Sequence, residues 1–156
     1  MILKMDHIPL YHILLADDDP DHSRLFRHIL HKIDSSLKLS YVKDGDALIK
    51  FLRSHSVDLV FLDLKMPCKT GHECLEEIKN DTSLRDIPVI IYSSSSQMTD
   101  IQKSFKNKAD IYMVKPFSSD HLKKALLSVL EIGKKGLDTI RRHYFINNQF
   151  VPFTAT

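Results

Sequence analysis

Short apolar runs alternate with amphipathic segments along the chain, and this alternation restricts the fold more than any other feature. The runs occupy residues 11–16, 37–42, 57–62, 87–92 and 110–114. They are continuously apolar and of strand length, as in strands that are buried on both faces. The segments between them place apolar residues three or four positions apart, as Phe26, Ile29, Leu30 and Ile33 do, which is typical of helices. The pattern therefore predicts five consecutive strand–helix units.

Repeated strand–helix units predict an α/β protein: a doubly wound, five-stranded parallel sheet that helices cover on both faces. The chain has 156 residues, which is enough for one such domain. We expect this domain to span residues 11–132. It would follow an N-terminal segment, residues 1–10, and precede a C-terminal extension, residues 133–156.

The composition gives no reason to expect a nucleic acid or a membrane as partner. The net charge is +2, and no stretch approaches 18 consecutive apolar residues. The first ten residues lack the apolar centre and cleavage site of a signal peptide. Cys68 and Cys74 lie six positions apart, a spacing that fits neither a CxxC redox pair nor a zinc site. The expectation is a cytoplasmic protein with reduced thiols.

Polar side chains follow four of the five predicted strands. Asp17, Asp18 and Asp19 follow the first strand, Asp63 the third, Ser93 the fourth and Lys115 the fifth. Parallel strands end at one edge of the sheet, where ligands bind next to the point at which the strand order reverses. Asp17, Asp18 and Asp63 offer carboxylate oxygens, which suit Mg²⁺. Ser93 and Lys115 are suited to phosphoryl oxygens, so the sequence predicts Mg²⁺-dependent phosphoryl transfer with Asp63 as the nucleophile.

At these positions the chain resembles the receiver domain of two-component response regulators, a family with the flavodoxin-like fold. The matching residues are Asp17 and Asp18, Asp63 within FLDLKMP, Gly71, Ser93, Tyr112, and Lys115 with Pro116. The spacings also fit the family, with 45 positions from Asp18 to Asp63, 30 from Asp63 to Ser93 and 22 from Ser93 to Lys115. The resemblance covers residues 11–132.

The resemblance implies a metal-dependent phosphorylation site. Asp63 would be the phospho-acceptor and would take a phosphoryl group from the phosphohistidine of a sensor histidine kinase. Asp18, Asp63 and the backbone carbonyl of Lys65 would bind Mg²⁺ directly. Asp17 would act on the metal through water.

The resemblance also implies a conformational switch. Ser93 and Lys115 would hold the phosphoryl oxygens. As Ser93 moves toward the phosphate, Tyr112 would rotate inward and alter the surface of the fourth helix, fifth strand and fifth helix. The bond between Lys115 and Pro116 would be cis.

Two features depart from the family pattern or leave a property open. Lys108 stands where relatives have a glycine. Because a non-glycine residue adopts a left-handed conformation only at some cost, we expect the local turn to differ here. Lys65 and Ser95 lie two residues beyond active residues, where relatives tune the access of water to the acyl phosphate. The sequence therefore does not set the lifetime of the phosphorylated state.

The same residues have purely structural interpretations. Residues 17–19 would make a solvated acidic turn with Asp19 or Asp21 capping the following helix, and we expect the Asp21 cap in either case. Ser93 opens a run of four serines that suits a polar loop, and Tyr112 suits the packed face of a strand. We favour the site because Asp63 and the other strand-end residues occur together.

The C-terminal extension is too aromatic for a disordered tail. Its apolar residues are Leu137, Ile140, Tyr144, Phe145, Phe150 and Phe153. We expect it to dock on its own domain or on a twin subunit, as a helix (137–143) followed by two strands, HYFI and QFVPF, around an Asn147–Asn148 turn. Contact of residues 141–143 with a kinase is the alternative.

The functional prediction is a stand-alone response regulator that catalyses only its own phosphorylation and dephosphorylation. Its partner would be a sensor histidine kinase, of the phytochrome type to judge from the tail and the MPxxxGxECLEEIK pattern. A homodimer would form through the surface of the fourth helix, fifth strand and fifth helix or through the tail.

Other functions remain as alternatives. A phosphorelay intermediate without its own output would use the same site, and a degenerate receiver would act as an unphosphorylated scaffold. A haloacid-dehalogenase-type phosphatase would need Thr or Val where Asp21 stands. A flavodoxin-like FMN-binding protein would need a Ser/Thr-rich phosphate loop where this chain has carboxylates.

Overall fold

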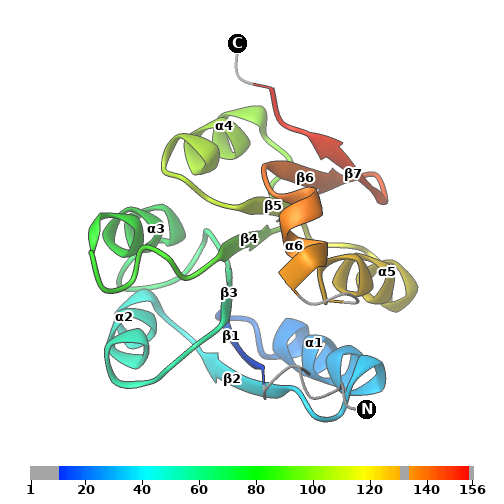
Figure 1. Ribbon diagram of the computed structural model, residues 1–156, viewed down its shortest axis with the longest axis horizontal. Coiled ribbons are helices and arrows are strands. Elements are labelled where there is room, and N and C mark those ends of the chain that lie inside the picture. Colours follow the sequence, from blue (N-terminus) through cyan, green and yellow to red (C-terminus); the bar gives the residue numbers. More distant parts are fainter. Residues whose placement is uncertain (1–10, 131–133, 155–156) are drawn as a thin grey trace, which may run out of the picture.

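The computed structural model of the protein describes residues 11–130 and 134–154. The predicted N-terminal segment, residues 1–10, lies outside this range. In the described part, five strand–helix units follow one another, and a helix and two further strands come after them (Figure 1). The elements are β1 (His12–Ala16), α1 (Pro20–Ile33), β2 (Lys38–Val42), α2 (Gly45–Ser54), β3 (Leu59–Leu62), α3 (Gly71–Asn80), β4 (Val89–Ser93), α4 (Met98–Lys106), β5 (Ile111–Val114), α5 (Ser119–Leu130), α6 (Lys134–Ile140), β6 (His143–Ile146) and β7 (Gln149–Pro152). All five predicted strands are confirmed.

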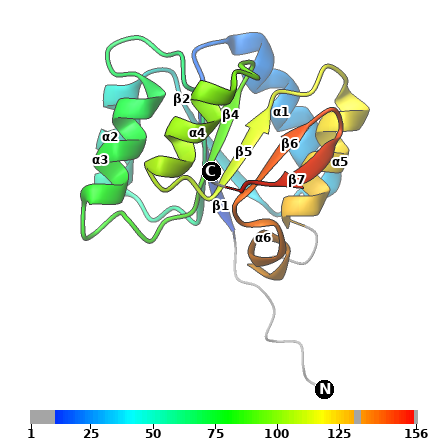
Figure 2. The ribbon, with the colours of Figure 1, turned by 90° about the horizontal axis from the view of Figure 1, so that it is seen from above.

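The strands form one sheet in the order β2-β1-β3-β4-β5-β6-β7. Every neighbouring pair is parallel except β6 and β7, which are antiparallel. The strand order reverses beside β1, which lies between β2 and β3. Helices α2, α3 and α4 cover one face of the sheet and α1 and α5 cover the other (Figure 2). The predicted doubly wound α/β fold is confirmed, and two strands extend its sheet beyond the expected five.

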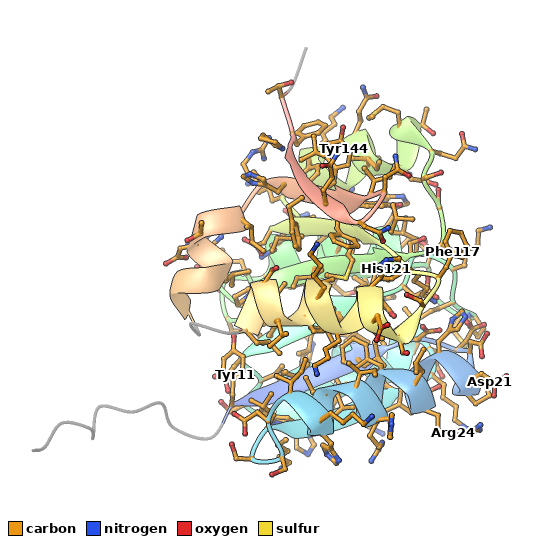
Figure 3. All side chains as sticks on the ribbon, turned by 90° about the vertical axis from the view of Figure 1, so that its right-hand side faces the viewer. Tyr11, Asp21, Arg24, Phe117, His121 and Tyr144 are labelled. Atoms are coloured by element: carbon orange, nitrogen blue, oxygen red, sulfur yellow. The ribbon has the colours of Figure 1, made fainter. Side chains whose placement is uncertain are left out.

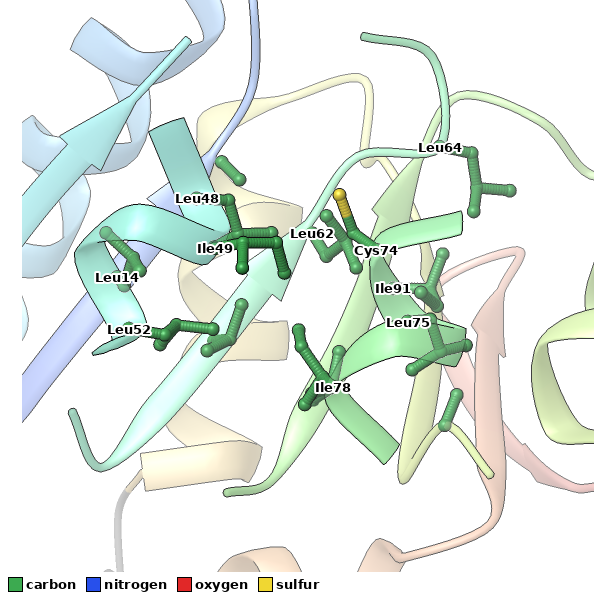
Figure 4. Packing of buried hydrophobic residues seen from close by; sticks show 14 of the residues in the cluster. Leu14, Leu48, Ile49, Leu52, Leu62, Leu64, Cys74, Leu75, Ile78 and Ile91 are labelled. Carbon is green, nitrogen blue, oxygen red and sulfur yellow. The ribbon is translucent and has the colours of Figure 1, made fainter. Parts of the chain in front are cut away.

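The core consists of two layers, one on each face of the sheet. Leu14 of β1 belongs to the layer under α2, α3 and α4, part of which is drawn in Figure 4. Its neighbours Ile13 and Leu15 point to the opposite face and pack under α1 and α5. This alternation on a fully buried strand explains why the strand sequences are continuously apolar.

The C-terminal extension is a helix followed by a β-hairpin. The helix lies at Lys134–Ile140, three residues earlier at each end than the predicted 137–143. The two predicted strands are confirmed as β6 and β7. Asn147 and Asn148 between them both have positive φ, 54° and 65°, as the two central residues of a type I′ hairpin turn require.

The hairpin packs on the edge of the chain's own domain. β6 runs parallel to β5, with Tyr112 opposite Tyr144. The backbone N–H of Arg142 donates to the carbonyl of Asp110 at 2.6 Å, and the Arg141 Nε lies 3.2 Å from the Asp110 carboxylate. The carboxylate of Asp110 also accepts from Lys79 of α3, so this residue ties the extension to the sheet and to α3.

Aromatic stacking fixes the end of the extension on α4. The Phe153 ring stacks on Phe105 with 4.5 Å between ring centroids, and the Arg142 guanidinium lies 5.4 Å from the Phe105 centroid. The N–H of Phe153 donates to the carbonyl of Arg142 at 2.9 Å. Side chains and backbone therefore hold the hairpin against α4 as well as β5.

The expected difference in the turn at Lys108 is not found, because this residue adopts the left-handed conformation that suits a glycine, with φ 73°. It is the residue after the C-cap of α4. Its N–H donates to the carbonyl of Phe105, and the N–H of Ala109 donates to that of Ser104. This pair of bonds is the Schellman motif, in which glycine is favoured at the Lys108 position.

We predict that Lys108→Gly stabilises the protein. The left-handed conformation costs a side chain roughly 1–2 kcal/mol, and the added freedom of glycine in the unfolded chain offsets part of the gain. The free energy of unfolding, measured in urea, should rise by about 0.5–1 kcal/mol. Lys108→Ala keeps a Cβ and should show no such gain; equal stability of the two variants would contradict this explanation.

Gly71 lets α3 begin directly against the end of β3. Its N–H donates to the carbonyl of Leu64 at 2.9 Å. A Cβ at this position would lie 2.2 Å from the carbonyl oxygen of Asp63 and 2.6 Å from the Cα of Leu64. These are rigid backbone atoms, so any larger residue has to displace the peptide that follows Asp63.

We therefore predict that Gly71→Ala destabilises the protein by about 1–3 kcal/mol through overpacking. Chemical denaturation measures the loss. Glu76→Ala, on the exposed side of the same helix, is the matched control and should change stability by less than about 0.5 kcal/mol. If the Gly71→Ala protein were as stable as the wild type, the backbone after Asp63 would have moved at no measurable cost, which would contradict this prediction.

Candidate functional site

The predicted strand-end residues converge at the carboxyl edge of the sheet. Asp17 and Asp63 directly follow β1 and β3, Ser93 ends β4, and Lys115 directly follows β5. Because β1, β3, β4 and β5 are consecutive neighbours in the sheet, these four ends stand side by side. The site lies next to the point where the strand order reverses, as expected for this class of sheet.

A buried lysine bridges two buried carboxylates at the centre of this edge. The Lys115 Nζ lies 2.8 Å from the Asp17 Oδ2 and 3.0 Å from the Asp63 Oδ2. The Asp17 side chain is fully buried, and those of Asp63 and Lys115 are 8% and 9% exposed. The ammonium therefore offsets the repulsion between two carboxylates that water hardly screens.

Asp18 adds a third carboxylate from the exposed side. Asp17, Asp18 and Asp63 each offer a ligand oxygen, and these oxygens lie within 4.8 Å of one another. Two oxygen ligands of one Mg²⁺ ion are about 3 to 4.2 Å apart, so the spacing of the three oxygens is close to that of ligands of a shared ion. The donor set is all oxygen and anionic, which suits a hard divalent cation.

The environment changes the proton affinity of the acceptor candidate. Burial raises the pKa of Asp63, and the negative charge of Asp17 adds to this effect. The ammonium of Lys115 and the N–H of Lys65, 3.3 Å from the Asp63 Oδ1, lower the pKa and partly offset it. Without Lys115, burial and the charge of Asp17 would raise the pKa of Asp63 further.

Tyr92 forms the floor beneath the lysine. The Lys115 Nζ lies 5.3 Å from the centroid of the Tyr92 ring. This ring packs edge-to-face against Phe26 and Phe61, at 5.5 and 6.1 Å between centroids. Burial, with the nearby charges of Asp17 and Asp63, raises the pKa of Tyr92. The lysine thus lies above an aromatic cluster that is also part of the core.

Ser93 and Tyr112 meet in one hydrogen-bond network through Ser95. The buried Ser93 hydroxyl accepts from the N–H of Ser95 at 3.1 Å. The Tyr112 hydroxyl donates to the Ser95 carbonyl at 2.9 Å, and its ring is fully buried. The Ser95 hydroxyl donates to Asp100 of α4 at 2.6 Å. Tyr112 therefore points inward and connects β5 to the loop that follows Ser93.

A cavity of about 310 Å³ opens beside this network, between α3 and α4. Lys65, Ser93, Ser95 and Asp100 are among the residues that line it. The loop after β4 therefore borders open space.

His22 is the residue that the sequence analysis missed. It lies in the first turn of α1, and its Nδ1 is 2.9 Å from the Lys115 Nζ. The same atom is 3.7 Å from the Asp17 Oδ2. The sequence marks this residue only by its position, five residues after Asp17, in the first turn of the helix that follows β1.

The remaining acids after β1 have structural roles. Asp19 is the N-cap of α1 and accepts from the N–H groups of Asp21 and His22 at 2.9 and 3.4 Å. The expectation that Asp21 caps the helix is wrong, because the chain enters the helix at Pro20, one residue earlier. Asp21 instead pairs with Arg24 on the exposed end of the molecule seen in Figure 3.

The expected cis bond before Pro116 is also not found: every peptide bond in the described ranges is trans. The trans form is the intrinsically favoured one before proline. Lys115 reaches both carboxylates in this form, so the contact does not depend on a cis bond.

The two cysteines are free, with Cys68 exposed and Cys74 buried. Burial raises the pKa of the Cys74 thiol to about 12. Across residues 11–130 and 134–154, no helix is long and apolar enough to span a membrane.

Comparison with known proteins identifies the family. A family model described as the response regulator receiver domain matches residues 13–127. The response regulator Rcp1 of Synechocystis sp. (strain ATCC 27184 / PCC 6803 / Kazusa) is 32% identical over 135 residues, which cover 82% of this chain and 90% of Rcp1. Two other curated relatives are longer, and the matches cover 64% and 49% of their lengths.

Solved structures agree with the family match. The phosphorylated cyanobacterial phytochrome response regulator RcpA has a TM-score of 0.71 at 30% identity, with 76% of this chain and 89% of RcpA covered. The Mn²⁺-bound form of Rcp1 has a TM-score of 0.71 at 28% identity, with 80% and 96% covered. The chain therefore belongs to the family of response regulator receiver domains.

Proposed function

We propose that Asp63 is the phospho-acceptor of this response regulator. The observation that carries the proposal is the Lys115 ammonium between the buried carboxylates of Asp17 and Asp63, with Asp18 within ligand distance. In the transfer, an Asp63 oxygen forms a bond to phosphorus while the bond from phosphorus to the donor nitrogen or oxygen breaks. The donor leaves with the electron pair of that bond.

The chain's own residues prepare Asp63 for this step. The Lys65 N–H holds the Asp63 Oδ1 and Lys115 holds the Oδ2, which fixes the carboxylate plane. Lys115 then turns from Asp63 to the incoming phosphoryl oxygens, and Ser93 supplies a hydroxyl to them. As Ser93 moves toward the phosphoryl group to donate its hydroxyl proton, its oxygen moves away from the Ser95 N–H, from which it accepts a hydrogen bond in the structure. This movement of the loop would affect Tyr112, whose hydroxyl donates to the Ser95 carbonyl.

We further propose Mg²⁺ as the metal, bound by Asp18, Asp63 and the backbone carbonyl of Lys65, with Asp17 acting through water. The all-oxygen donor set supports a hard cation, and the Rcp1 relative carries Mn²⁺ in its solved structure. The metal would supply positive charge that offsets the phosphoryl group and the carboxylates.

The phosphoryl donor would be a sensor histidine kinase, of the phytochrome type by analogy with RcpA. Two exposed apolar side chains support a protein partner near the site. Phe117, two residues after Lys115, is fully exposed, and Leu25 of α1 is partly exposed. Phe117 and Asp21 lie at the same end of the molecule in Figure 3. A partner that covers this end would bury apolar surface beside the acceptor.

The two alternatives are not favoured. A haloacid-dehalogenase-type phosphatase does not fit the receiver-family match over residues 13–127. A phosphorelay intermediate without its own output would use the same chemistry, but Rcp1 and RcpA are both named response regulators.

We predict that the protein acquires one phosphoryl group when it is incubated with acetyl phosphate and Mg²⁺. Intact-mass spectrometry would show the adduct on the wild type. Asp63→Asn should show none, because an amide is not a nucleophile of this kind, and EDTA should suppress the reaction on the wild type. Asp21→Asn, an exposed acid of α1, is the matched control and should react normally. An equal adduct on Asp63→Asn would refute the acceptor assignment.

We also propose that residues 133–156 form an extension that covers the edge of the receiver domain, residues 11–132. Because β6 pairs with β5, the tail and the α4-β5-α5 surface, both proposed for a homodimer, are one continuous surface here. A second copy would therefore have to bind on the hairpin or displace it.

The stack of Phe153 on Phe105 tests how firmly the extension is held. Phe153→Ala should lower the free energy of unfolding by about 1–2 kcal/mol, because the half-buried ring loses its contacts with Phe105 and Arg142. Thermal or urea unfolding measures the loss, with exposed Thr154→Ala as control. Sedimentation over a range of concentrations would report the oligomeric state. If truncation after Ile132 changed neither the free energy of unfolding nor the oligomeric state, this result would argue against a docked extension.

A further inference from the structure

The Lys115 ammonium has a third partner besides the two carboxylates. Its Nζ lies 2.8 Å from the Asp17 Oδ2, 3.0 Å from the Asp63 Oδ2 and 2.9 Å from the His22 Nδ1. An ammonium has three N–H donors and no acceptor. The three distances therefore account for all three donors of this lysine.

This contact fixes the form of the imidazole. Because Lys115 can only donate, the His22 Nδ1 accepts and carries no proton. The ring proton is then on Nε2, which lies 3.5 Å from the Asp19 Oδ2. A protonated Nδ1 would face the lysine's positive charge at 2.9 Å, whereas the carboxylate of Asp17 is farther away at 3.7 Å. The geometry is that of a neutral histidine.

Asp19 lies beside the ring. Its Oδ1 caps α1 by accepting from the N–H groups of Asp21 and His22, while its Oδ2 lies 3.5 Å from the His22 Nε2. The carboxylate that caps the helix therefore also faces the imidazole. His22 is partly exposed, and its contact with Lys115 joins α1 to the residue that follows β5.

We propose that His22 is a positioning residue for phosphoryl transfer, and that it acts by holding the Lys115 ammonium. This inference rests on the proposed function of the site. During the reaction, Asp17 also interacts with the metal, and Asp63 interacts with the metal and the phosphoryl group. Of these three partners of Lys115, only the neutral Nδ1 of His22 binds neither the metal nor the phosphoryl group. It keeps the ammonium above the acceptor while the lysine turns toward the phosphoryl oxygens.

The test compares side chains that keep or remove an acceptor at the Nδ1 position. The Asn side-chain oxygen can take the place of Nδ1, whereas that of Gln falls near Nε2. Initial rates of phosphorylation by acetyl phosphate at saturating Mg²⁺ should fall about 3- to 10-fold in His22→Ala and His22→Gln. His22→Asn should stay within about twofold of the wild type. The Mg²⁺ concentration for half-maximal rate should change less than about twofold in every variant, because His22 acts through Lys115.

Further arms separate positioning from a structural role. In a Lys115→Ala background, His22→Ala should cause no additional loss of rate, since the group that it positions is gone. Exposed His28→Ala on the same helix should react like the wild type. In the wild type, ¹⁵N NMR should find the His22 proton on Nε2, and this preference should weaken in Lys115→Ala.

The possible failures are distinguishable. An unphosphorylated wild type would refute the proposed function and this role with it. A wild type that is phosphorylated on Asp63 while all His22 variants react normally would refute the positioning role alone. Equal losses in His22→Asn and His22→Ala, or an additive loss in the Lys115→Ala background, would also overturn it.

Discussion

The ion pair of Lys115 with Asp17 and Asp63 is the interaction on which the site depends. Two carboxylates that are almost fully buried repel each other strongly unless a positive charge lies between them. The lysine that provides this charge is 98 positions from Asp17 along the chain. Only the parallel arrangement of β1, β3 and β5 brings the three groups to one edge. The site can therefore balance its charges only in a sheet with this strand order.

β5 links this site to the C-terminal extension. Its end places Lys115 at the carboxylates, its Tyr112 is bound to the loop that follows Ser93, and its outer edge pairs with β6. In many sheets such an edge is open to other chains. Here the hairpin covers it, and the new edge strand ends in Pro152, which has no N–H to donate to a further strand. Any rearrangement around Tyr112 takes place one strand away from the hairpin.

Helix caps and the residues at helix ends determine the conformation of the loops around the site. Asp19 caps the start of α1 and faces the His22 ring, whereas Gly71 starts α3 in contact with the backbone of Asp63. Lys108 shows the opposite case, because a residue other than glycine occupies the left-handed end of α4. The glycine next to the acceptor is therefore one that the neighbouring backbone does not allow a larger residue to replace, whereas the departure from the family pattern lies at the end of α4.

The sequence by itself determined the strand–helix units and the residues at the strand ends. Apolar periodicity is local, and parallel strands end at a common edge, so Asp17, Asp18, Asp63, Ser93 and Lys115 were predictable as a group. The hairpin was predictable for the same reason, since the two asparagines specify its turn locally.

The tertiary structure decided what depends on contacts between distant segments. The pairing of β6 with β5 reflects which edge of the folded sheet is free, and the trans bond at Pro116 and the cap at Asp19 depend on how the chain enters each element. The contact of His22 with Lys115 joins residues 93 positions apart. It exists because the first turn of α1 and the residue after β5 meet at the same edge of the folded sheet, and no periodicity within one segment encodes that meeting.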